Sequence, residues 1–395
     1  MGTPTLRLLI LRSVFLVLAF SLAGMEARAQ CTSNASGLLE PLGLALSNQN
    51  NLLVAETGTT SPESGRISIV AQDGQRRTLL AGLPSAINDV NEPSGPAGLF
   101  MRGRTLYVAI GTGDVGRAGP APGTTIPNPA PVSSPIFSSV LAIQFSANTE
   151  KTTTGFTLTA EGQLALASGQ VVTLSDSVGG TLLMRLIANF PNYIPFPLPT
   201  FSGNIQLSNP YGLVAVDDVL YVSDGGRNLV WQIDLLTGAF SPVVSFPRIP
   251  NPLFGIVPAG GPFLDAVPTG IAFSNDHLFV TLLRGVPFPP GTSTVERIDP
   301  QAGTETPFIP GLKTAIAVLP TKADGNTDFL VLEHASVGPF FGSPGLLLRF
   351  AGAGGPPAVV AGCFTRPTAM TFDKKTGTLY VSEYGGRIVA ISIAP

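Results

Sequence analysis

The amino-acid sequence predicts an all-β fold: a six-bladed β-propeller of four-stranded antiparallel blades. Short runs of Val, Ile, Leu, Tyr and Phe alternate with tight polar or Gly-bearing turns, a pattern typical of antiparallel strands. This pattern recurs six times along the 395 residues. Only 12% of the residues are charged, whereas the chain contains 45 Gly and 37 Pro. Such a composition suits a compact repeat protein with many turns.

The clearest copy of the repeat covers residues 209–247. It is expected to form strands at 212–216, 219–223, 229–234 and 240–246, with polar or Gly-bearing turns between them. A single meander of this kind cannot bury both of its faces. Copies that stand side by side around an axis bury the faces against one another, as the blades of a propeller do.

All six copies share a Gly-led or Ala-led first strand, a polar turn and a second strand with a central Val. The distance from the leading residue to that Val is 10 residues in three copies and 11, 12 and 16 in the others. The leading residues are Gly43, Gly98, Gly212, Gly270, Ala315 and Ala369. The last copy ends after its third strand. Because an unpaired blade edge is a liability, residues 32–38 are expected to supply the missing outer strand and close the ring.

Residues 148–205 interrupt the repeat. Residues 155–175 alternate like a hairpin and 190–201 are rich in Pro, but neither part has a Gly-led strand followed by a Leu-Tyr-Val strand. We expect an insertion in or after blade two, with a seventh blade as the alternative.

The first 29 residues are expected to be a secretory signal peptide. Arg7 and Arg12 form a basic start, 14–24 an apolar core, and Ala27-Arg28-Ala29 a cleavage site. Eleven apolar or small residues are too few for a membrane span, which needs about 20. We therefore expect cleavage after Ala29, leaving residues 30–395 as one secreted or periplasmic propeller domain.

Removal of residues 1–29 takes away three Arg and one Glu, so the formal charge changes from −3 to −5. A mildly acidic, charge-poor surface lacks the basic patch that nucleic acids require. We expect a monomer that binds neither nucleic acid nor, after cleavage, a membrane.

The two cysteines, Cys31 and Cys363, are expected to stay unbonded unless the N-terminal segment folds back. Cys31 would begin the closing strand at one face of the ring, whereas Cys363 lies near the other end of a neighbouring outer strand. A strand of six residues spans about 20 Å, and a disulfide needs Cα atoms about 6 Å apart.

Several short phrases together resemble the ScyD/ScyE family, NHL-repeat-like propellers named from scytonemin-pigment gene clusters. The resemblance covers nearly all of the mature chain and is weakest at 148–205 and in the fifth copy. It implies an exported six-bladed propeller and no settled reaction. The phrases are Glu92-Pro-Ser-Gly-Pro-Ala-Gly98, Ser208-Asn-Pro-Tyr-Gly212, Val267-Pro-Thr-Gly270, Gly285-Val-Pro-Phe-Pro-Pro-Gly291, Gly65-Arg-Ile-Ser68 and Ala81-Gly-Leu-Pro84.

The candidate ligand-binding residues come from equivalent positions in the repeats. Four acids stand two residues after the central Val, where second strands end and long loops begin, and we expect them around one mouth of the ring. The acids are Glu56, Asp224, Glu333 and Glu383, with His334 and Asn209 beside them. They either cap strand ends by accepting backbone N–H groups or form an acidic mouth for a cation or a polyhydroxylated ligand.

Two classes of function remain open. The first is a non-catalytic binding or scaffold propeller that takes a small polar ligand or a protein partner at its loop-rich face. The second is a calcium-dependent hydrolase of the gluconolactonase type, with a quinone-dependent sugar dehydrogenase as a weaker third. The chain has two histidines, and neither lies near a Ser or Cys motif that would indicate a triad. No cofactor is predicted, although Ca²⁺ fits the acidic mouth.

Overall fold

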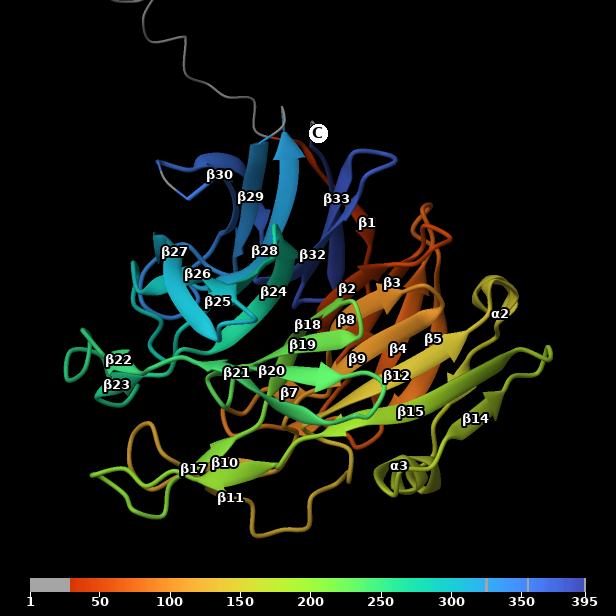
Figure 1. The fold of residues 1–395 in the computed structure, drawn as a ribbon, viewed down its shortest axis with the longest axis horizontal. Helices are drawn as coiled ribbons and strands as arrows, with labels where there is room; N and C mark the ends of the chain where they lie inside the picture. The colour runs from red at the N-terminus through yellow and green to blue at the C-terminus, as the bar shows by residue number, and fades with distance from the viewer. Residues whose placement is uncertain (1–28, 324–325, 354, 394–395) are drawn as a thin grey trace, which may run out of the picture.

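The computed structural model describes residues 29–323, 326–353 and 355–393. Six small sheets stand in a ring, which makes the six-bladed propeller predicted from the repeats (Figure 1). The predicted signal peptide, apart from Ala29, lies outside the described residues. No helix among these residues is long and apolar enough to cross a membrane.

Each blade begins with its innermost strand and continues outward along the chain. Blade one contains β2 (Pro41–Leu46), β3 (Leu52–Glu56), β4 (Gly65–Val70) and β5 (Arg76–Leu83). Blade two contains β8 (Pro96–Arg102), β9 (Thr105–Ile110), β12 (Ser139–Phe145) and β15 (Thr181–Asn189). Blade three contains β18 (Pro210–Val216), β19 (Val219–Asp224), β20 (Leu229–Asp234) and β21 (Phe240–Ser245).

The second half of the ring repeats this order. Blade four contains β24 (Pro268–Ser274), β25 (His277–Leu282), β26 (Ser293–Asp299) and β27 (Thr304–Leu312). Blade five contains β28 (Ala315–Ala323), β29 (Asn326–Glu333), β30 (Gly345–Ala351) and β31 (Ala358–Phe364). Blade six contains β32 (Pro367–Asp373), β33 (Thr378–Glu383), β34 (Arg387–Ser392) and the N-terminal strand β1 (Cys31–Ala35).

The ring closes as predicted. Strand β1 pairs antiparallel with β34, with Cys31 opposite Ile391 and Ala35 opposite Ile388. The N-terminal segment therefore supplies the outer strand of the last blade, which would otherwise leave an open edge.

The prediction for the cysteines was wrong: Cys31 and Cys363 form a disulfide, with Cα atoms 6.6 Å apart. The predicted separation of the two cysteines assumes that the outer strands of neighbouring blades run parallel to the ring axis. Each sheet twists from its inner to its outer strand, so the outer strands β31 and β1 run obliquely. The N–H of Ala29 also donates to the carbonyl of Val360 (3.0 Å), which brings the start of β1 against blade five.

The leading glycines of the repeat allow the inner strands to approach closely. A Cβ on Gly43 would collide with the carbonyl oxygen of Ala97 in the next blade, and a Cβ on Gly98 would collide with that of Tyr211. These positions need Gly because backbone meets backbone where the blades converge on the axis.

Hydrophobic clusters between neighbouring blades form the core. Within the described residues, six clusters each join one blade to the next around the ring. The second strands are buried along most of their length, and in β3 every side chain is buried. They carry continuous apolar runs because both of their faces pack against other blades.

The irregular segment contributes to blades one and two. Between β12 and β15 lie α2 (Ala147–Thr152), β13 (Phe156–Thr157), α3 (Ala160–Ala167) and β14 (Val172–Ser175). Strand β13 pairs in parallel with β5, and β14 adds a fifth strand beside β15. Buried Glu150 of α2 pairs with Arg104 (2.8 Å) and accepts from the side chain of Asn51 (3.0 Å), which ties the insertion to both blades.

Short two-stranded ribbons decorate the loops. They are β6 (Ala86–Ile87) with β7 (Pro93–Ser94), β10 (Gly116–Ala118) with β11 (Thr125–Pro127), β16 (Tyr193–Pro195) with β17 (Ile205–Leu207), and β22 (Ile249–Pro250) with β23 (Phe263–Leu264). Strands β10, β11 and β17, and beside them β22 and β23, project beyond the blades (Figure 1). They form walls around the mouth of the ring.

Candidate functional site

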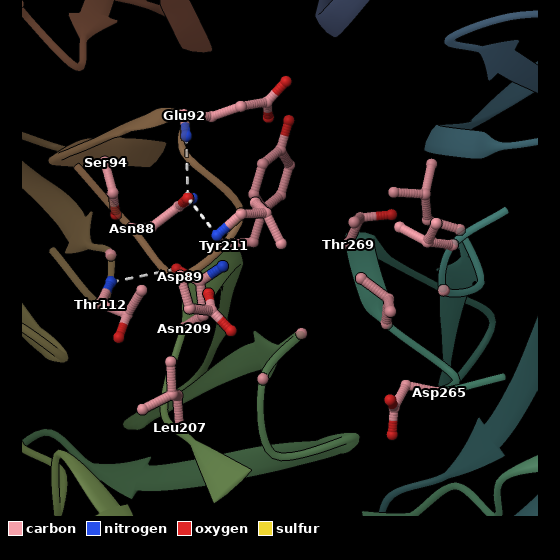
Figure 2. Close-up of a pocket in the computed structure, with 18 of the residues that line it drawn as sticks. Asn88, Asp89, Glu92, Ser94, Thr112, Leu207, Asn209, Tyr211, Asp265 and Thr269 are labelled. Atoms are coloured by element: carbon pink, nitrogen blue, oxygen red, sulfur yellow. Dashed lines mark hydrogen bonds between the residues drawn. The ribbon is translucent and has the colours of Figure 1, made fainter. Parts of the chain in front are cut away.

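A cavity of about 650 Å³ lies where the first strands begin and the long loops rise. Residues from every blade line it, together with the ribbons β10–β11, β16–β17 and β22–β23. The long loops that follow second strands contribute lining residues from 111–138, 284–292 and 334–345. Figure 2 shows two of its walls, with Asn88, Asp89, Thr112 and Asn209 on one side and Asp265 and Thr269 on the other.

The four predicted acids do not line this cavity. Each is buried at the end of its second strand and accepts a backbone N–H from the segment that leads into the first strand of the same blade. The donors are Leu39 for Glu56, Asn209 for Asp224, Lys313 for Glu333 and Thr365 for Glu383. This arrangement is the strand-capping alternative of the sequence analysis.

Two of the four acids also form ion pairs. Arg66 donates to Glu56 (2.6 Å) and Arg387 donates to Glu383 (2.6 Å). Asp224 instead accepts from the indole Nε1 of Trp231 (3.0 Å), and its pKa is raised because burial disfavours the charge. Burial likewise raises the pKa of Glu333 to about 7.

The two remaining predicted residues, Asn209 and His334, do line the cavity. The Oδ1 atom of Asn209 accepts the backbone N–H of Thr112 (3.1 Å), and its Nδ2 group has no bond to the described residues. The hydroxyl of Thr112 is buried and has no hydrogen-bond partner among these residues. The Nδ2 group of Asn209 is therefore an uncharged donor available to a ligand, whereas the hydroxyl of Thr112 is enclosed by protein.

His334 belongs to a chain of cationic and aromatic groups. Its Nδ1–H donates to the carbonyl of Pro367 (2.9 Å), and its Nε2 accepts from the Nε of Arg366 (3.2 Å). Burial lowers the pKa of His334 to about 4, so the imidazole is neutral near pH 7. Arg366 pairs with Glu92 (2.9 Å) and lies over the ring of Tyr384, 4.3 Å from its centre.

On the opposite side, Asp265 is engaged by several donors. Arg248 pairs with it through Nε (2.8 Å) and Nη2 (3.0 Å), and the amide of Asn228 donates to it (2.8 Å). Asp89 accepts from the hydroxyl of Thr125 (3.0 Å), and burial raises its pKa, with a smaller contribution from the charge of Asp265.

Tyr211 crosses the ring at the base of the cavity. It belongs to blade three, and its hydroxyl donates to the carbonyl of Thr368 in blade six (3.0 Å). Burial raises the pKa of Tyr211, so it remains a neutral donor. The bond connects opposite blades and narrows the central channel at this level.

Within the described ranges, no group of three or more His, Cys, Asp or Glu side chains is arranged to hold a metal ion. Of the lining acids, Glu92 and Asp265 pair with guanidinium groups, whereas the side-chain partner of Asp89 is the uncharged hydroxyl of Thr125.

Most of the lining was not predicted from the sequence, including Asp89, Arg248, Asp265, Arg284 and Arg366. The predicted residues come from the ends of second strands, whereas the first strand of a blade is the one nearest the axis. Residues just before the first strands therefore face the cavity. Asn209 and Arg366 both occupy this position, directly before Pro210 and Pro367, so the X-Pro step that opens a blade was the available signal.

No protein-family model and no curated protein matches the chain. Among solved structures, it is similar to virginiamycin B lyase from Staphylococcus aureus, at 14% identity and a TM-score of 0.46, covering 93% of this chain and 99% of that one. It is also similar to a gluconolactonase from Xanthomonas campestris, at 12% identity and a TM-score of 0.48, covering 94% and 93%.

A third similar structure is regucalcin, a calcium-binding protein from Agrobacterium tumefaciens, at 10% identity and a TM-score of 0.49, covering 92% of this chain and 93% of that one. At these identities and scores, the architecture is established by the blades themselves. The activities of the three proteins are not assigned to this chain.

Proposed function

We propose that this chain is an exported, non-catalytic binding propeller of the ScyD/ScyE type, which holds a small molecule in its central cavity. The proposal rests on which polar groups of the cavity lining already have partners and which do not. Its guanidinium and carboxylate pairs, Arg366 with Glu92 and Arg248 with Asp265, already satisfy each other. The side-chain amide of Asn209, whose Nδ2 group has no bond to the described residues, is left to orient a ligand.

The size and composition of the cavity support this function. A volume of about 650 Å³ is within the range that takes a drug-sized molecule, and such pockets combine apolar walls with a few polar groups. The aromatic rings of Phe288 and Phe341 stack 4.2 Å apart at the rim and supply part of the apolar surface. The binding of one compact molecule follows from this combination.

Export is part of the proposal. The N-terminal 29 residues have the composition of a signal peptide, and the Cys31–Cys363 disulfide suits an oxidising compartment. We propose that the mature chain acts as a monomer outside the cytoplasm, in the periplasm or beyond it.

A calcium-dependent hydrolase remains the second candidate, and Asp89 favours it. Its carboxyl group lines the cavity and accepts from one side chain, that of Thr125; burial raises its pKa, and the repulsion of Asp265 adds to this by a smaller amount. A divalent cation beside Asp89 would relieve that repulsion and leave Asn209 as a further oxygen ligand.

A retention experiment tests the binding function. The exported protein is incubated with a small-molecule extract of its own cells, passed through gel filtration and denatured, and the released compounds are identified by mass spectrometry. Ala118 lines the cavity and is exposed, so Ala118→Trp should block it; exposed Ala160 of α3 lies outside the lining, and Ala160→Trp is the matched control.

We expect one compound, chemically unchanged, to remain with the wild type and with Ala160→Trp but not with Ala118→Trp. A compound released in converted form, or δ-gluconolactone hydrolysis that needs millimolar calcium and is lost in Asp89→Asn, would establish the hydrolase instead. Equal retention by all three proteins would place the ligand outside the cavity.

A further inference from the structure

We propose that the ligand of the central cavity carries a carboxylate on an apolar or aromatic body, and that Arg284 receives this carboxylate. The inference rests on the proposed binding function and names the chemical class of the ligand. Arg284 lines the cavity at the end of β25, in the loop 284–292.

Arg284 is a buried cation that forms no ion pair within the described residues, although the carboxylate of Glu296 is near enough to act on its charge. It is 7% exposed, and none of the ion pairs between described residues includes it. Its Nε donates to the carbonyl of Thr292 (2.8 Å), whereas its Nη groups have no bond to the described residues. Glu296 raises the pKa of Arg284, but burial has the larger effect and lowers it.

A guanidinium in this state is costly unless an anion approaches it. A buried charge needs a paired charge or hydrogen bonds to offset its lost hydration. The other cavity-lining guanidiniums, those of Arg248 and Arg366, already have carboxylate partners. Of these three, only Arg284 has both Nη groups without a bond to the described residues, and two Nη groups in one plane match the two oxygens of a carboxylate.

The backbone at Arg284 is a second, independent indication. Its φ angle is +75°, in the left-handed region, where a residue with a Cβ is disfavoured and Gly is not. Strained non-glycine residues of this kind concentrate at ligand sites. The strain is consistent with a side chain that is held at this point for binding.

The surroundings define the rest of the ligand. Phe288 and Phe341 stack on each other and line the same cavity, and Val286 and Phe263 add further apolar surface. A carboxylate at Arg284 would therefore continue into an apolar or aromatic body. A bare inorganic anion would leave these walls in contact with water.

Titration with simple probes tests the proposal. Sodium benzoate, its neutral counterpart benzamide and phenyl phosphate are each titrated into the wild-type protein by calorimetry. We expect benzoate to bind, and Arg284→Gln to weaken this binding about tenfold or more, because a charge-assisted pair of hydrogen bonds is lost. Benzamide should bind more weakly than benzoate to the wild type and equally to both proteins.

Two further variants separate binding from folding. Arg297 lies exposed on β26 of the same blade, so Arg297→Gln makes the same change in charge and should bind benzoate as the wild type does. Arg284→Gly removes the guanidinium and accommodates the left-handed backbone. It should fold with wild-type cooperativity in a thermal melt and still fail to bind benzoate.

The proposal is overturned if wild type does not bind benzoate, if benzamide binds as well as benzoate, or if Arg284→Gln binds as wild type does. Tighter binding of phenyl phosphate than of benzoate would replace the carboxylate by a phosphate. A neutral compound retained equally by wild type and Arg284→Gln would end this inference and leave the binding function intact.

Discussion

In four of the six blades, a buried carboxylate at the end of the second strand fastens the blade to the segment that enters it. Asp224 shows how much one such residue can hold: it accepts the N–H of Asn209 (2.7 Å), the N–H of Arg227 (3.0 Å) and the indole N–H of Trp231 (3.0 Å). Because the carboxylate of Asp224 fixes the backbone of Asn209, which lines the cavity, it supports the site without entering it.

Asp224→Ala should lower the free energy of unfolding by about 3 kcal/mol, because three donors lose their acceptor in a buried place. Urea denaturation measures the change. Exposed Asp218, on the same blade, is the control, and Asp218→Ala should alter stability by less than about 0.5 kcal/mol. Equal effects of the two substitutions would mean that the bonds of Asp224 contribute nothing.

The raised pKa of Glu333 should make the free energy of unfolding depend on pH in an unusual way. Burial raises its pKa from 4.5 to about 7. Between these values, the folded protein keeps a proton that the unfolded chain has released, so this residue makes stability fall as pH rises. Neighbouring His334, whose pKa burial lowers to about 4, has the opposite effect between pH 4 and 6.5. The two effects oppose each other in wild type.

Glu333→Gln should remove only the first effect. Relative to wild type, the variant should gain about 2 to 3 kcal/mol of stability between pH 5 and 8. Urea unfolding at several pH values measures this difference, with exposed Glu63→Gln as the control. A difference between Glu333→Gln and wild type that stays constant with pH would contradict the raised pKa.

Residue identities alone could not separate a capping acid from a ligand-binding acid. The sequence places Glu56, Asp224, Glu333 and Glu383 correctly at equivalent strand ends. The partner that all four share is a backbone N–H group, which leaves no trace in side-chain identities. Arg284 was equally invisible, because its loop length and its left-handed backbone belong to no repeat.

At the scale of elements, strand β1 and its disulfide hold the ring closed from two directions. The strand pairs with β34 in blade six, and Cys31 bonds to Cys363 in blade five. The pairing could be predicted because blade six lacked an outer strand. The disulfide could not, because the twist of a blade changes which outer-strand residues meet.

Loss of this disulfide should destabilise the protein by about 2 to 5 kcal/mol, since the link spans 332 residues of sequence. Cys363→Ser should therefore unfold at a lower urea concentration than wild type, and a reductant should shift wild type toward the variant without affecting the variant. Thiol titration of unfolded, unreduced wild type should find no free cysteine. Two free thiols would contradict the bond.

The whole molecule was the most predictable level. The repeat of Gly-led and Val-centred strands indicates six blades, because the same steric demand recurs wherever the inner strands converge: Gly43 and Gly98 both face a carbonyl of the next blade. For the cavity, the sequence predicts which face of the ring carries the long loops, but not the shape or the lining residues. Its shape depends on four ribbons and an insertion that differ from blade to blade.

The central claim is that a small molecule sits unchanged on the ring axis. The most direct measurement is a crystal structure of the exported protein with the compound that it retains. The account predicts one intact molecule inside the cavity of about 650 Å³, with an anionic group on Arg284 and its body against Phe288 and Phe341. A cavity that holds only water, with the compound bound on the outside of a blade, would contradict it.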